Sequence, residues 1–248
     1  MTNKQAPSYH DLAGWYDAIY DASGKDYAAE GQALLSLAQA GGAEPRSLLD
    51  VACGTGRHLE FFAQHLDEVV GTDTSSEMLT IASVRLGPSV TVDEADFRTL
   101  DLGRSFDIVT CLFSSIGHVT NEAELDQAVA AMAAHVAPRG TLVIEPWLTP
   151  DRVTEGGVRD LATANTPDGV VARASSSVPD GDALVVSFAW AVATPGGVAS
   201  LEEERRMPLF SADRYIQAVE ATGLAPEWLD DVPALTAGRG LLVGRRSA

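Results

Sequence analysis

The residues with the clearest chemical meaning lie in the run LLDVACGTGRHL, residues 48–59. An apolar segment breaks there into a turn that contains Gly54 and Gly56, and a helical pattern follows directly. Glycines remove side chains where the backbone must bend and approach a ligand, and the start of a helix offers free N–H groups. The run therefore predicts a ligand site between the first strand of a sheet and the helix that follows it.

Two neighbouring features indicate which ligand this turn would accept. Leu59 stands where the dinucleotide fingerprint Gly-x-Gly-x-x-Gly has its third glycine, which disfavours NAD and FAD because helix and strand are then expected to approach less closely. The chain also contains no Walker loop. The next strand ends in Asp73, whose carboxylate can accept hydrogen bonds from both hydroxyls of a ribose. A nucleoside without a pyrophosphate fits this combination best.

Polar and aromatic side chains also follow the third and fourth strands of the pattern. Asp96 can accept from the exocyclic amine of adenine, Phe97 offers a ring that packs nearby, and residues 114–118 follow the fourth strand. Open α/β sheets bind ligands beyond the carboxyl ends of their strands. We therefore expect Gly54, Asp73, Asp96 and residues 114–118 to converge on one crevice.

Alternating strand and helix patterns position these residues. Short β-branched runs at 48–52, 69–73, 90–96, 106–113 and 141–145 predict strands, and the apolar spacing of 59–66 and 125–132 predicts helices. Thr74 begins a capping box with Glu77, and Asn121 precedes Glu124 at the same offset. This order is typical of βαβ units around a mostly parallel, Rossmann-like sheet.

The alternation of strand and helix patterns ends after Pro146. Strand-like runs at 170–178, 183–194 and 198–209 are separated by hairpin turns, which predicts an antiparallel insertion of three strands. A helix at 211–222 and closing strands at 228–232 and 241–245 follow. We expect residues 1–148 to form N-terminal helices and the α/β core, 149–208 an inserted β subdomain that serves as a lid or dimer surface, and 209–248 the rest of the core.

Composition narrows the classes of partner. The 248 residues include 17 Lys and Arg against 35 Asp and Glu, a formal net charge of −18. Such an acidic field repels phosphate backbones and anionic lipid, which argues against a nucleic-acid or membrane-surface binder. The start lacks a basic, apolar leader, no run is long enough to span a bilayer, and the 2 cysteines are too few for a disulfide framework. We expect a cytoplasmic protein without a metal site.

Together these features resemble the class I S-adenosylmethionine-dependent methyltransferases, on LDVACGTG at 49–56, Asp73 and Asp96. More narrowly, nearly the whole chain resembles the dTDP-aminosugar N,N-dimethyltransferases of macrolide deoxysugar biosynthesis. The segments that carry this likeness are WYDAIY at 15–20, GKDYAAE at 24–30, TCLFSSIGH at 110–118, EPW at 145–147 and GRGLLVG at 238–244. The resemblance implies S-adenosylmethionine as cofactor, S-adenosylhomocysteine as product, and a nucleotide-linked aminosugar that is dimethylated in antibiotic biosynthesis.

The resemblance also implies roles for individual residues. Tyr20 and His118 would flank the transferring methyl group and orient the amine, with His118 accepting a proton directly or through water. Cofactor contacts are implied for Tyr16, Tyr27, Asp50, Ala52, Gly54, Gly56, Asp73, Thr74, Met78, Asp96, Phe97, Leu112 and Phe113. Acceptor contacts are implied for Ser114, Glu145, Trp147, Arg173 and Arg239, the two arginines as candidates for the pyrophosphate.

Two alternatives stay open at this point. The first keeps the cofactor and replaces the acceptor by another small amine or hydroxyl of secondary metabolism, since residues 151–166 match no segment of the family pattern and are expected to touch the acceptor. The second is a nucleoside-binding regulatory module without catalysis. The sequence also leaves open the position of the amine, the number of methyl groups and the oligomeric state, although an exposed edge of the antiparallel insertion favours a homodimer.

Overall fold

The computed structural model describes residues 12–40, 42, 44–232, 234–235 and 238–248. Its contacts divide the chain into two compact units, which we describe separately. The α/β unit contains Tyr27–Arg152 and Pro208–Ala248, and the β unit contains Val153–Met207 with the described residues 12–26. This division differs from the expected one, because the first helix, α1 (Ala13–Ala22), groups with the antiparallel sheet.

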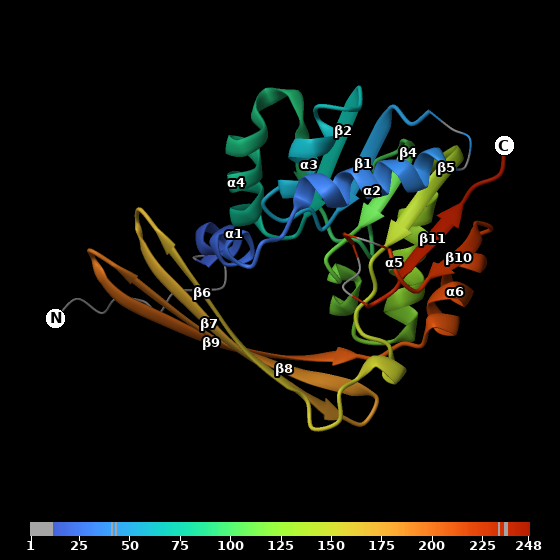
Figure 1. Cartoon of the computed structure of the whole chain (residues 1–248). Helices are drawn as coiled ribbons and strands as arrows, with labels where there is room; N and C mark the ends of the chain where they lie inside the picture. The colour runs from blue at the N-terminus through green and yellow to red at the C-terminus, as the bar shows by residue number, and fades with distance from the viewer. Residues whose placement is uncertain (1–11, 41, 43, 233, 236–237) are drawn as a thin grey trace. The chain divides into compact units, whose positions relative to one another are not determined.

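The α/β unit is one sheet flanked by helices (Figure 1). In the described part of the chain this sheet has seven strands in the order β10-β11-β5-β4-β1-β2-β3. The strands are β1 (Ser47–Val51), β2 (Glu68–Asp73), β3 (Thr91–Glu94), β4 (Phe106–Cys111), β5 (Val136–Ile144), β10 (Ala225–Leu229) and β11 (Leu241–Arg245). β1 to β5 pair in parallel, whereas β10 and β11 join antiparallel. The expected mostly parallel sheet is confirmed.

Helices cover both faces of this sheet. They are α2 (Tyr27–Gln39), α3 (Arg57–Phe62), α4 (Ser76–Leu86), α5 (Glu122–Ala134) and α6 (Ala212–Glu220), with short 3-10 turns η2 (Gly87–Ser89), η3 (Ser115–His118) and η4 (Pro150–Arg152). Leu34 of α2 and Leu59 of α3 share a buried cluster with Leu48 of β1. Leu125 of α5 belongs to a second cluster with Leu49, the next residue of β1. Successive strand residues therefore point into two cores, as a sheet covered on both sides requires.

Leu59 packs against a glycine of the neighbouring strand. A Cβ atom at Gly71 of β2 would lie 2.6 Å from Leu59 Cδ1 and 2.8 Å from Cys53 Sγ. The space that the dinucleotide fingerprint obtains from a third glycine on the helix is thus supplied by the strand. Gly71 therefore leaves room for the Leu59 side chain between α3 and β2.

Several strand ends differ from their predicted positions. β3 ends at Glu94 and β4 at Cys111, each two residues before the expected end, and β5 already begins at Val136. The early end of β4 has a local cause, because Phe113 and Ser114 have φ of 58° and 61°, outside the extended region. Strand β10 also lies three residues before its expected position, whereas β11 begins and ends as predicted.

The two predicted helix caps have different outcomes. Ser75, and not Thr74, caps α4, because Ser75 Oγ accepts from the N–H of Met78 at 3.2 Å. Asn121 caps α5 as expected, since its Oδ1 accepts from the N–H of Glu124 at 3.0 Å. Both caps satisfy backbone donors that the first turn of a helix leaves unpaired.

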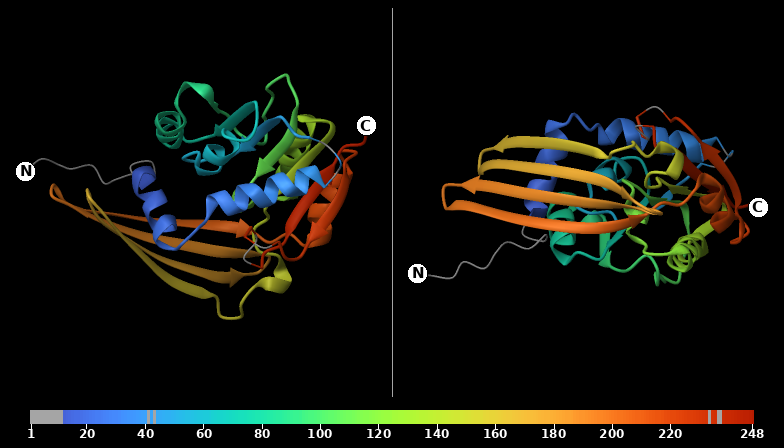
Figure 2. Two further views of the ribbon diagram at one scale, coloured as in Figure 1. Left: turned by 45° about the horizontal axis from the view of Figure 1, so that its top comes forward. Right: turned by 90° about the horizontal axis from the view of Figure 1, so that it is seen from below.

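The β unit consists of α1 and an antiparallel sheet in the order β6-β7-β8-β9, whose strands lie side by side in Figure 2. Its strands are β6 (Val158–Thr166), β7 (Gly169–Asp180), β8 (Ala183–Thr194) and β9 (Gly197–Pro208). Strand β6 was not predicted, because its sequence VRDLATANT lacks the regular apolar alternation of a half-buried strand. Leu12 and Ile19 join Val171, Trp190 and Val192 in the core of this unit.

Both cysteines lie in the core of the α/β unit. Cys53 and Cys111 are buried and unpaired, and loss of hydration raises the pKa of each thiol well above its ordinary value. They therefore act as small apolar side chains, Cys53 in the turn after β1 and Cys111 at the end of β4. Among the described helices, none is long and apolar enough to cross a bilayer.

Candidate functional site

The turn after β1 combines a tight backbone with open space. Ala52, Gly54 and Gly56 have φ of 58°, 57° and 76°, and Gly56 caps the N-terminus of α3. A Cβ at Gly56 would lie 2.9 Å from Leu86 Cδ1 and 3.1 Å from Ala82 Cβ, so the close packing and the positive φ together favour a glycine there. A Cβ at Gly54 would meet no described heavy atom within 4 Å. The turn therefore fits a ligand that approaches the backbone at Gly54.

Asp73 ties this turn to the neighbouring strand. Its Oδ2 accepts from the N–H of Gly54 at 2.9 Å, and its Oδ1 accepts from the N–H of Ser75 at 2.9 Å. Carboxylate oxygens have further lone pairs, so the group can still accept from two ribose hydroxyls. Thr74 lies exposed just after it, and Met78 is buried in the first turn of α4. The structure thus joins Gly54 and Asp73 as the sequence predicted.

Asp50 is a buried carboxylate in β1, just before the turn. It is 2% exposed, and its Oδ1 accepts from the hydroxyl of Thr110 at 2.7 Å. Loss of hydration raises the pKa of Asp50 from 3.8 to about 6, against the opposing effects of His58 and of the Thr110 hydrogen bond. A charge kept this far from water destabilises the fold, a pattern common among residues kept for function.

Asp50→Asn should stabilise the protein at pH 7.5 and have little effect near pH 4. The folded state keeps the Asp50 proton to a higher pH than the unfolded state, so wild-type stability falls as the pH rises from about 4 to about 6. Above this window the variant should gain up to about 3 kcal/mol, because one pKa unit corresponds to about 1.4 kcal/mol. Thermal melts of both proteins at the two pH values measure this difference.

The same variant separates stability from binding. If Asp50 contacts the cofactor, as the resemblance implies, calorimetry should show weaker binding of S-adenosylhomocysteine although the fold is more stable. A melting-temperature difference that is the same at both pH values would contradict the assignment of the effect to the Asp50 charge.

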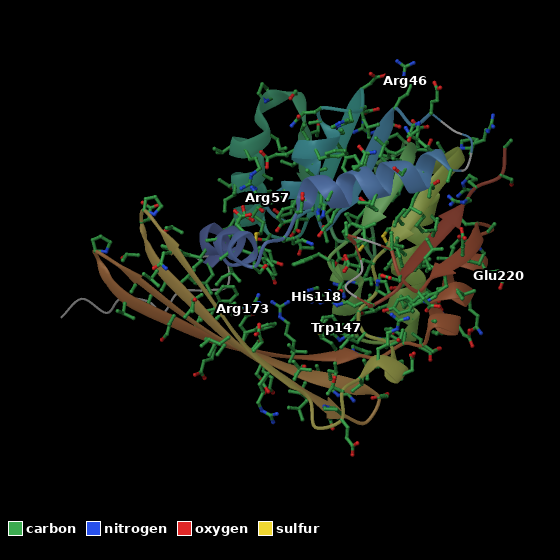
Figure 3. The ribbon with its side chains drawn as sticks, in the orientation of Figure 1. Arg46, Arg57, His118, Trp147, Arg173 and Glu220 are labelled. Carbon is green, nitrogen blue, oxygen red and sulfur yellow. The ribbon has the colours of Figure 1, made fainter. Side chains whose placement is uncertain are left out.

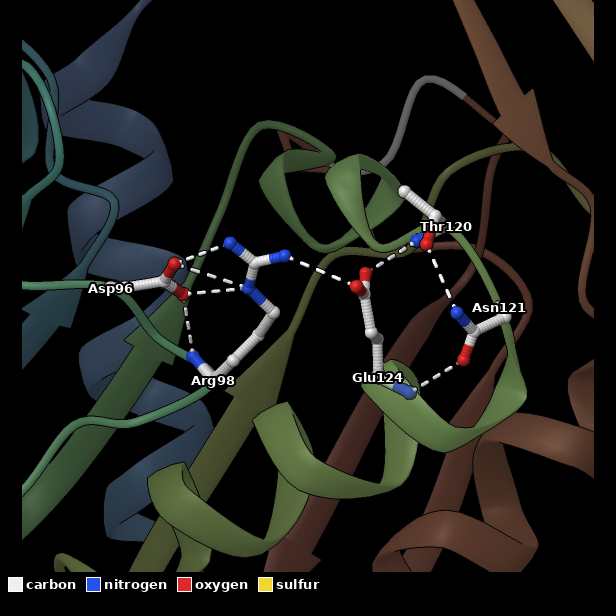
Figure 4. Close-up of polar contacts among 5 residues, drawn as sticks. All are labelled: Asp96, Arg98, Thr120, Asn121 and Glu124. Carbon is white, nitrogen blue, oxygen red and sulfur yellow. Dashed lines mark hydrogen bonds and ion pairs between the residues drawn. The ribbon is translucent and has the colours of Figure 1, made fainter.

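Asp96 follows β3 and is held by Arg98. The Nε of Arg98 donates to the two carboxylate oxygens at 2.9 and 3.1 Å, and the backbone N–H of Arg98 donates to Oδ1 at 2.9 Å (Figure 4). These hydrogen bonds lower the pKa of Asp96. Phe97 is half-buried and packs against the core. Asp96, which is expected to accept a hydrogen bond from adenine, is therefore an ionised carboxylate whose orientation is set by Arg98.

β4 ends in a strained turn that leads to His118. Phe113 and Ser114 have positive φ, which costs residues other than glycine of order 1 kcal/mol each. The N–H of Phe113 donates to Oε2 of Glu145 at 2.7 Å, and the hydroxyl of Ser114 donates to the carbonyl of Pro146 at 2.9 Å. η3 then ends at His118, which is exposed. Leu112, also an expected cofactor contact, is buried beneath this turn.

Four residues expected to contact the acceptor lie together in the α/β unit. Nη1 of Arg239 donates to Ser114 Oγ and to Glu145 Oε1, both at 3.3 Å, and its guanidinium lies 5.8 Å from the centre of the Trp147 ring. Trp147 comes from the loop after β5 (Figure 3). Its Nε1 is buried and donates to no described acceptor. A buried donor without a partner is unusual, so this N–H fits a bound molecule.

Three further expected residues meet within the β unit. The rings of Tyr16 and Tyr20 on α1 have centroids 4.7 Å apart. Nη1 of Arg173 on β7 donates to the hydroxyl of Tyr20 at 2.8 Å, and the guanidinium lies 5.2 Å from the centre of that ring. Arg173, expected at the pyrophosphate, therefore also holds the hydroxyl expected to orient the amine.

A buried pair between α2 and α3 was not predicted from the sequence. Oε2 of Glu30 and Nε2 of His58 are 2.7 Å apart, and both side chains are buried. The ring of Tyr27 meets the His58 ring edge-on at 5.0 Å, and the Arg57 guanidinium lies 4.8 Å from the Tyr27 ring centre. Tyr27, an expected cofactor contact, is thus held against the helix that begins at the glycine turn. Tyr27 and Glu30 are one helical turn apart in the sequence, and this spacing was the available signal that both side chains face α3.

Comparison with known proteins agrees with this geometry. Residues 48–140 match the family described as a methyltransferase domain. The chain is 40% identical to the dTDP-3-amino-3,6-dideoxy-alpha-D-glucopyranose N,N-dimethyltransferase of Streptomyces fradiae, over 97% of this chain and 92% of that protein. It is 39% identical to the dTDP-4-amino-2,3,4,6-tetradeoxy-D-glucose N,N-dimethyltransferase of Saccharopolyspora spinosa, over 96% of this chain and 93% of that protein.

A solved structure extends the similarity to three dimensions. The SAM-bound amino pentose methyltransferase of calicheamicin biosynthesis from Micromonospora echinaspora superimposes with a TM-score of 0.81 and 36% identity. The match covers 94% of this chain and 97% of that one. The resemblance and the fold class predicted from the sequence are therefore confirmed.

Proposed function

The chain belongs to the class I S-adenosylmethionine-dependent methyltransferases, in the group of the dTDP-aminosugar N,N-dimethyltransferases, and from this membership we propose that it dimethylates the amine of a dTDP-linked amino-deoxysugar. The observation that carries the proposal is the 40% identity to such an enzyme over 97% of the chain. The two relatives act on 3-amino and 4-amino sugars, so we assign the class of acceptor and not the position of its amine.

S-adenosylmethionine is the cofactor and supplies a methyl group on a positively charged sulfur. We assign its binding to the carboxyl ends of β1 to β4. Gly54 admits the ligand to the backbone, Asp73 accepts from the ribose hydroxyls, and Asp96 accepts from the adenine amine. The remaining expected contacts are Tyr16, Tyr27, Asp50, Ala52, Gly56, Thr74, Met78, Phe97, Leu112 and Phe113. The open space at Gly54 and the ordered carboxylate of Asp73 support this fit.

The chain's contribution to the reaction is to present a neutral amine in line with the methyl group. Positioning alone can lower such a barrier by roughly 7–11 kcal/mol at the upper end. Tyr20 and His118 orient the amine, and His118 accepts the proton that the amine loses, directly or through water. Arg173, which donates to the Tyr20 hydroxyl, limits the directions in which that hydroxyl can point.

The acceptor pocket is assigned to Ser114, Glu145, Trp147 and Arg239. Arg239 is a cation next to a buried carboxylate, and the indole N–H of Trp147 is a buried donor. A sugar offers hydroxyls to such a carboxylate, and a pyrophosphate accepts from arginine in a fork geometry. Arg173 is the second candidate for the pyrophosphate.

A thermal-shift screen tests this function most directly. The melting temperature is measured with S-adenosylhomocysteine alone and with dTDP, UDP or dTMP added, because a ligand of the folded state raises it by mass action. We expect an additional shift with dTDP and none with UDP. Mass spectrometry of a dTDP-aminosugar incubated with the cofactor should then show two added methyl groups. If the enzyme methylates free small amines and does not methylate nucleotide sugars, the proposed acceptor is wrong.

The expected location and partners belong to the same proposal. A cytoplasmic enzyme without nucleic-acid or membrane partners is supported by the net charge of −18 and by two buried thiols that stay unpaired.

We also propose a homodimer formed through the exposed face of the β-unit sheet. Residues paired across β6, β7 and β8 share this face, for example Leu161, Ala174 and Ala189. Leu161 is 67% exposed, and Val170, which lies further along the same face, is 44% exposed. The opposite face carries the buried cluster with α1. The apolar part of this face around Leu161, in a chain of net charge −18, favours a second copy of the chain as partner, because two-fold symmetry makes the surface self-complementary.

The double variant Leu161→Lys, Ala189→Lys should sediment as a monomer at concentrations where the wild type is a dimer. Burying two like charges against their symmetry mates costs several kcal/mol, which exceeds the margin of an ordinary interface. Analytical ultracentrifugation measures the mass of each form. Val84→Lys, at a position on α4 that is 83% exposed, is the matched control and should leave the dimer intact. A monomeric wild type would contradict the proposal.

A further inference from the structure

A continuous polar path connects Asp96 with the segment that follows His118 (Figure 4). Arg98 donates through Nε to Asp96 and through Nη1 to Oε1 of Glu124, the latter at 3.2 Å. The other oxygen of Glu124, Oε2, accepts from the backbone N–H of Thr120 at 2.8 Å. Arg98 therefore links a carboxylate expected to bind adenine with the backbone two residues after a residue expected to act on the amine.

The segment at the far end of this path is anchored at three points. Asn121 caps α5 through the N–H of Glu124, and its Nδ2 donates to Thr120 Oγ1 at 3.0 Å. Val119, between His118 and Thr120, is 1% exposed. Because η3 ends at His118 and α5 begins at Glu122, only a short connection separates the anchor from the histidine. The Thr120 backbone and His118 are therefore separated by Val119 alone, whose side chain is fixed by burial.

The bridge itself is poorly suited to stabilise the fold. The side chains of Arg98, Asp96 and Glu124 are 38%, 32% and 24% exposed, and ion pairs as accessible as these contribute little to stability. The N–H of Thr120 and Arg98 lower the pKa of Glu124, so both of its oxygens accept hydrogen bonds in the ionised form. The hydrogen bonds from Arg98 to Asp96 and Glu124 therefore orient these side chains more than they stabilise the fold.

We propose that Arg98 and Glu124 are positioning residues that couple adenine recognition at Asp96 to the placement of His118. This inference rests on the proposed function. An adenine amine that donates to Asp96 shares with Arg98 a carboxylate that Arg98 keeps ionised and oriented. The guanidinium then donates more fully to Glu124, which restricts the position of that carboxylate and of the Thr120 N–H that donates to it. Coupling of this kind is reciprocal, so the order of the Thr120 segment also affects cofactor affinity.

Hydrogen exchange with S-adenosylhomocysteine tests the coupling without any acceptor. In the wild type, the ligand should slow exchange of the backbone amides at 118–122 as well as those near Asp96. In Arg98→Met and in Glu124→Gln the ligand should still bind, with affinity lower by about five- to tenfold in both, because a reciprocal coupling that is lost for the segment is lost for the ligand as well. Both variants should lose the ligand-dependent protection at 118–122.

Kinetics with the aminosugar supply an independent readout. Glu124→Gln should lower kcat by about five- to tenfold at saturating cofactor, beyond its effect on cofactor affinity, because it loosens His118 and leaves Asp96 in place. Arg98→Lys should restore cofactor affinity but not kcat, since a single ammonium cannot hold two carboxylates as a guanidinium does. The matched control is Arg104→Met, which removes an Arg104–Glu68 ion pair whose side chains are 44% and 48% exposed, and should leave both readouts unchanged.

Two results would overturn the inference. One is ligand-dependent protection of 118–122 that is the same in Arg98→Met and Glu124→Gln as in the wild type. The other is an equal loss of kcat in Arg104→Met. A wild type that shows the protection but methylates no nucleotide aminosugar would refute the proposed function and leave the coupling supported.

Discussion

The double variant Tyr20→Phe, His118→Asn should lose turnover by about two to four orders of magnitude, the range that positioned proton-transfer groups contribute to catalysis. Tyr20 Oη accepts a hydrogen bond from Arg173, so its direction is fixed before any acceptor arrives. His118 is exposed at the end of η3, so a ligand or a water molecule can approach its imidazole. Without either group, the amine would meet the methyl group in more orientations and would lose its proton to bulk water only.

Single-turnover kinetics with a saturating dTDP-aminosugar measure this loss, and calorimetry with S-adenosylhomocysteine supplies the control. Cofactor affinity should change little, because neither side chain is assigned to the ribose or the adenine. The single variants separate the roles: if His118 is a proton acceptor, His118→Asn should lose most of its rate near neutral pH, where an alkylamine is still protonated, and should regain rate at alkaline pH, where the amine has lost its proton to solvent. Turnover close to the wild-type rate in the double variant would remove both residues from the mechanism.

The crevice at the strand ends could be predicted from the sequence because the sheet topology imposes it. Parallel strands place their carboxyl ends on one edge, so Gly54 and Asp73 had to lie near each other once β1 and β2 were recognised, and the structure joins them at 2.9 Å. The cluster of Ser114, Glu145 and Arg239 was expected only from the family resemblance. No spacing rule connects residues of three separate loops.

Other features could not be predicted because they depend on contacts between distant parts of the chain. The Arg98–Glu124 and Glu30–His58 pairs join different elements, and each residue alone is compatible with a solvated charge. The close packing of Leu59 on α3 depends on Gly71 in strand β2. β6 lacks apolar alternation, so only its pairing with β7 reveals a strand. Local patterns identify elements, whereas pairing between elements decides which polar residues meet.

Asp73→Ala should weaken binding of S-adenosylhomocysteine by more than about 100-fold. Hydrogen bonds to a charged group contribute about 1.5–3 kcal/mol each, and the carboxylate is assigned two ribose hydroxyls. The variant also removes the acceptor for the N–H groups of Gly54 and Ser75, which orders the turn and the start of α4. We therefore expect a lower melting temperature without ligand as well, because the N–H groups of Gly54 and Ser75 are left without an acceptor.

Isothermal titration well below the melting temperature separates these two effects, because it reports binding by the folded protein alone. Asp73→Asn should be intermediate, since its amide oxygen can replace one acceptor while its NH₂ group faces the other backbone donor. Asp93→Ala, at an exposed carboxylate of the adjacent strand β3, is the control and should bind like the wild type. If Asp73→Ala loses stability but binds S-adenosylhomocysteine within a few-fold of the wild type, Asp73 orders the turn and does not hold the ribose, and the carboxylate that recognises the nucleoside must be sought elsewhere along the strand ends.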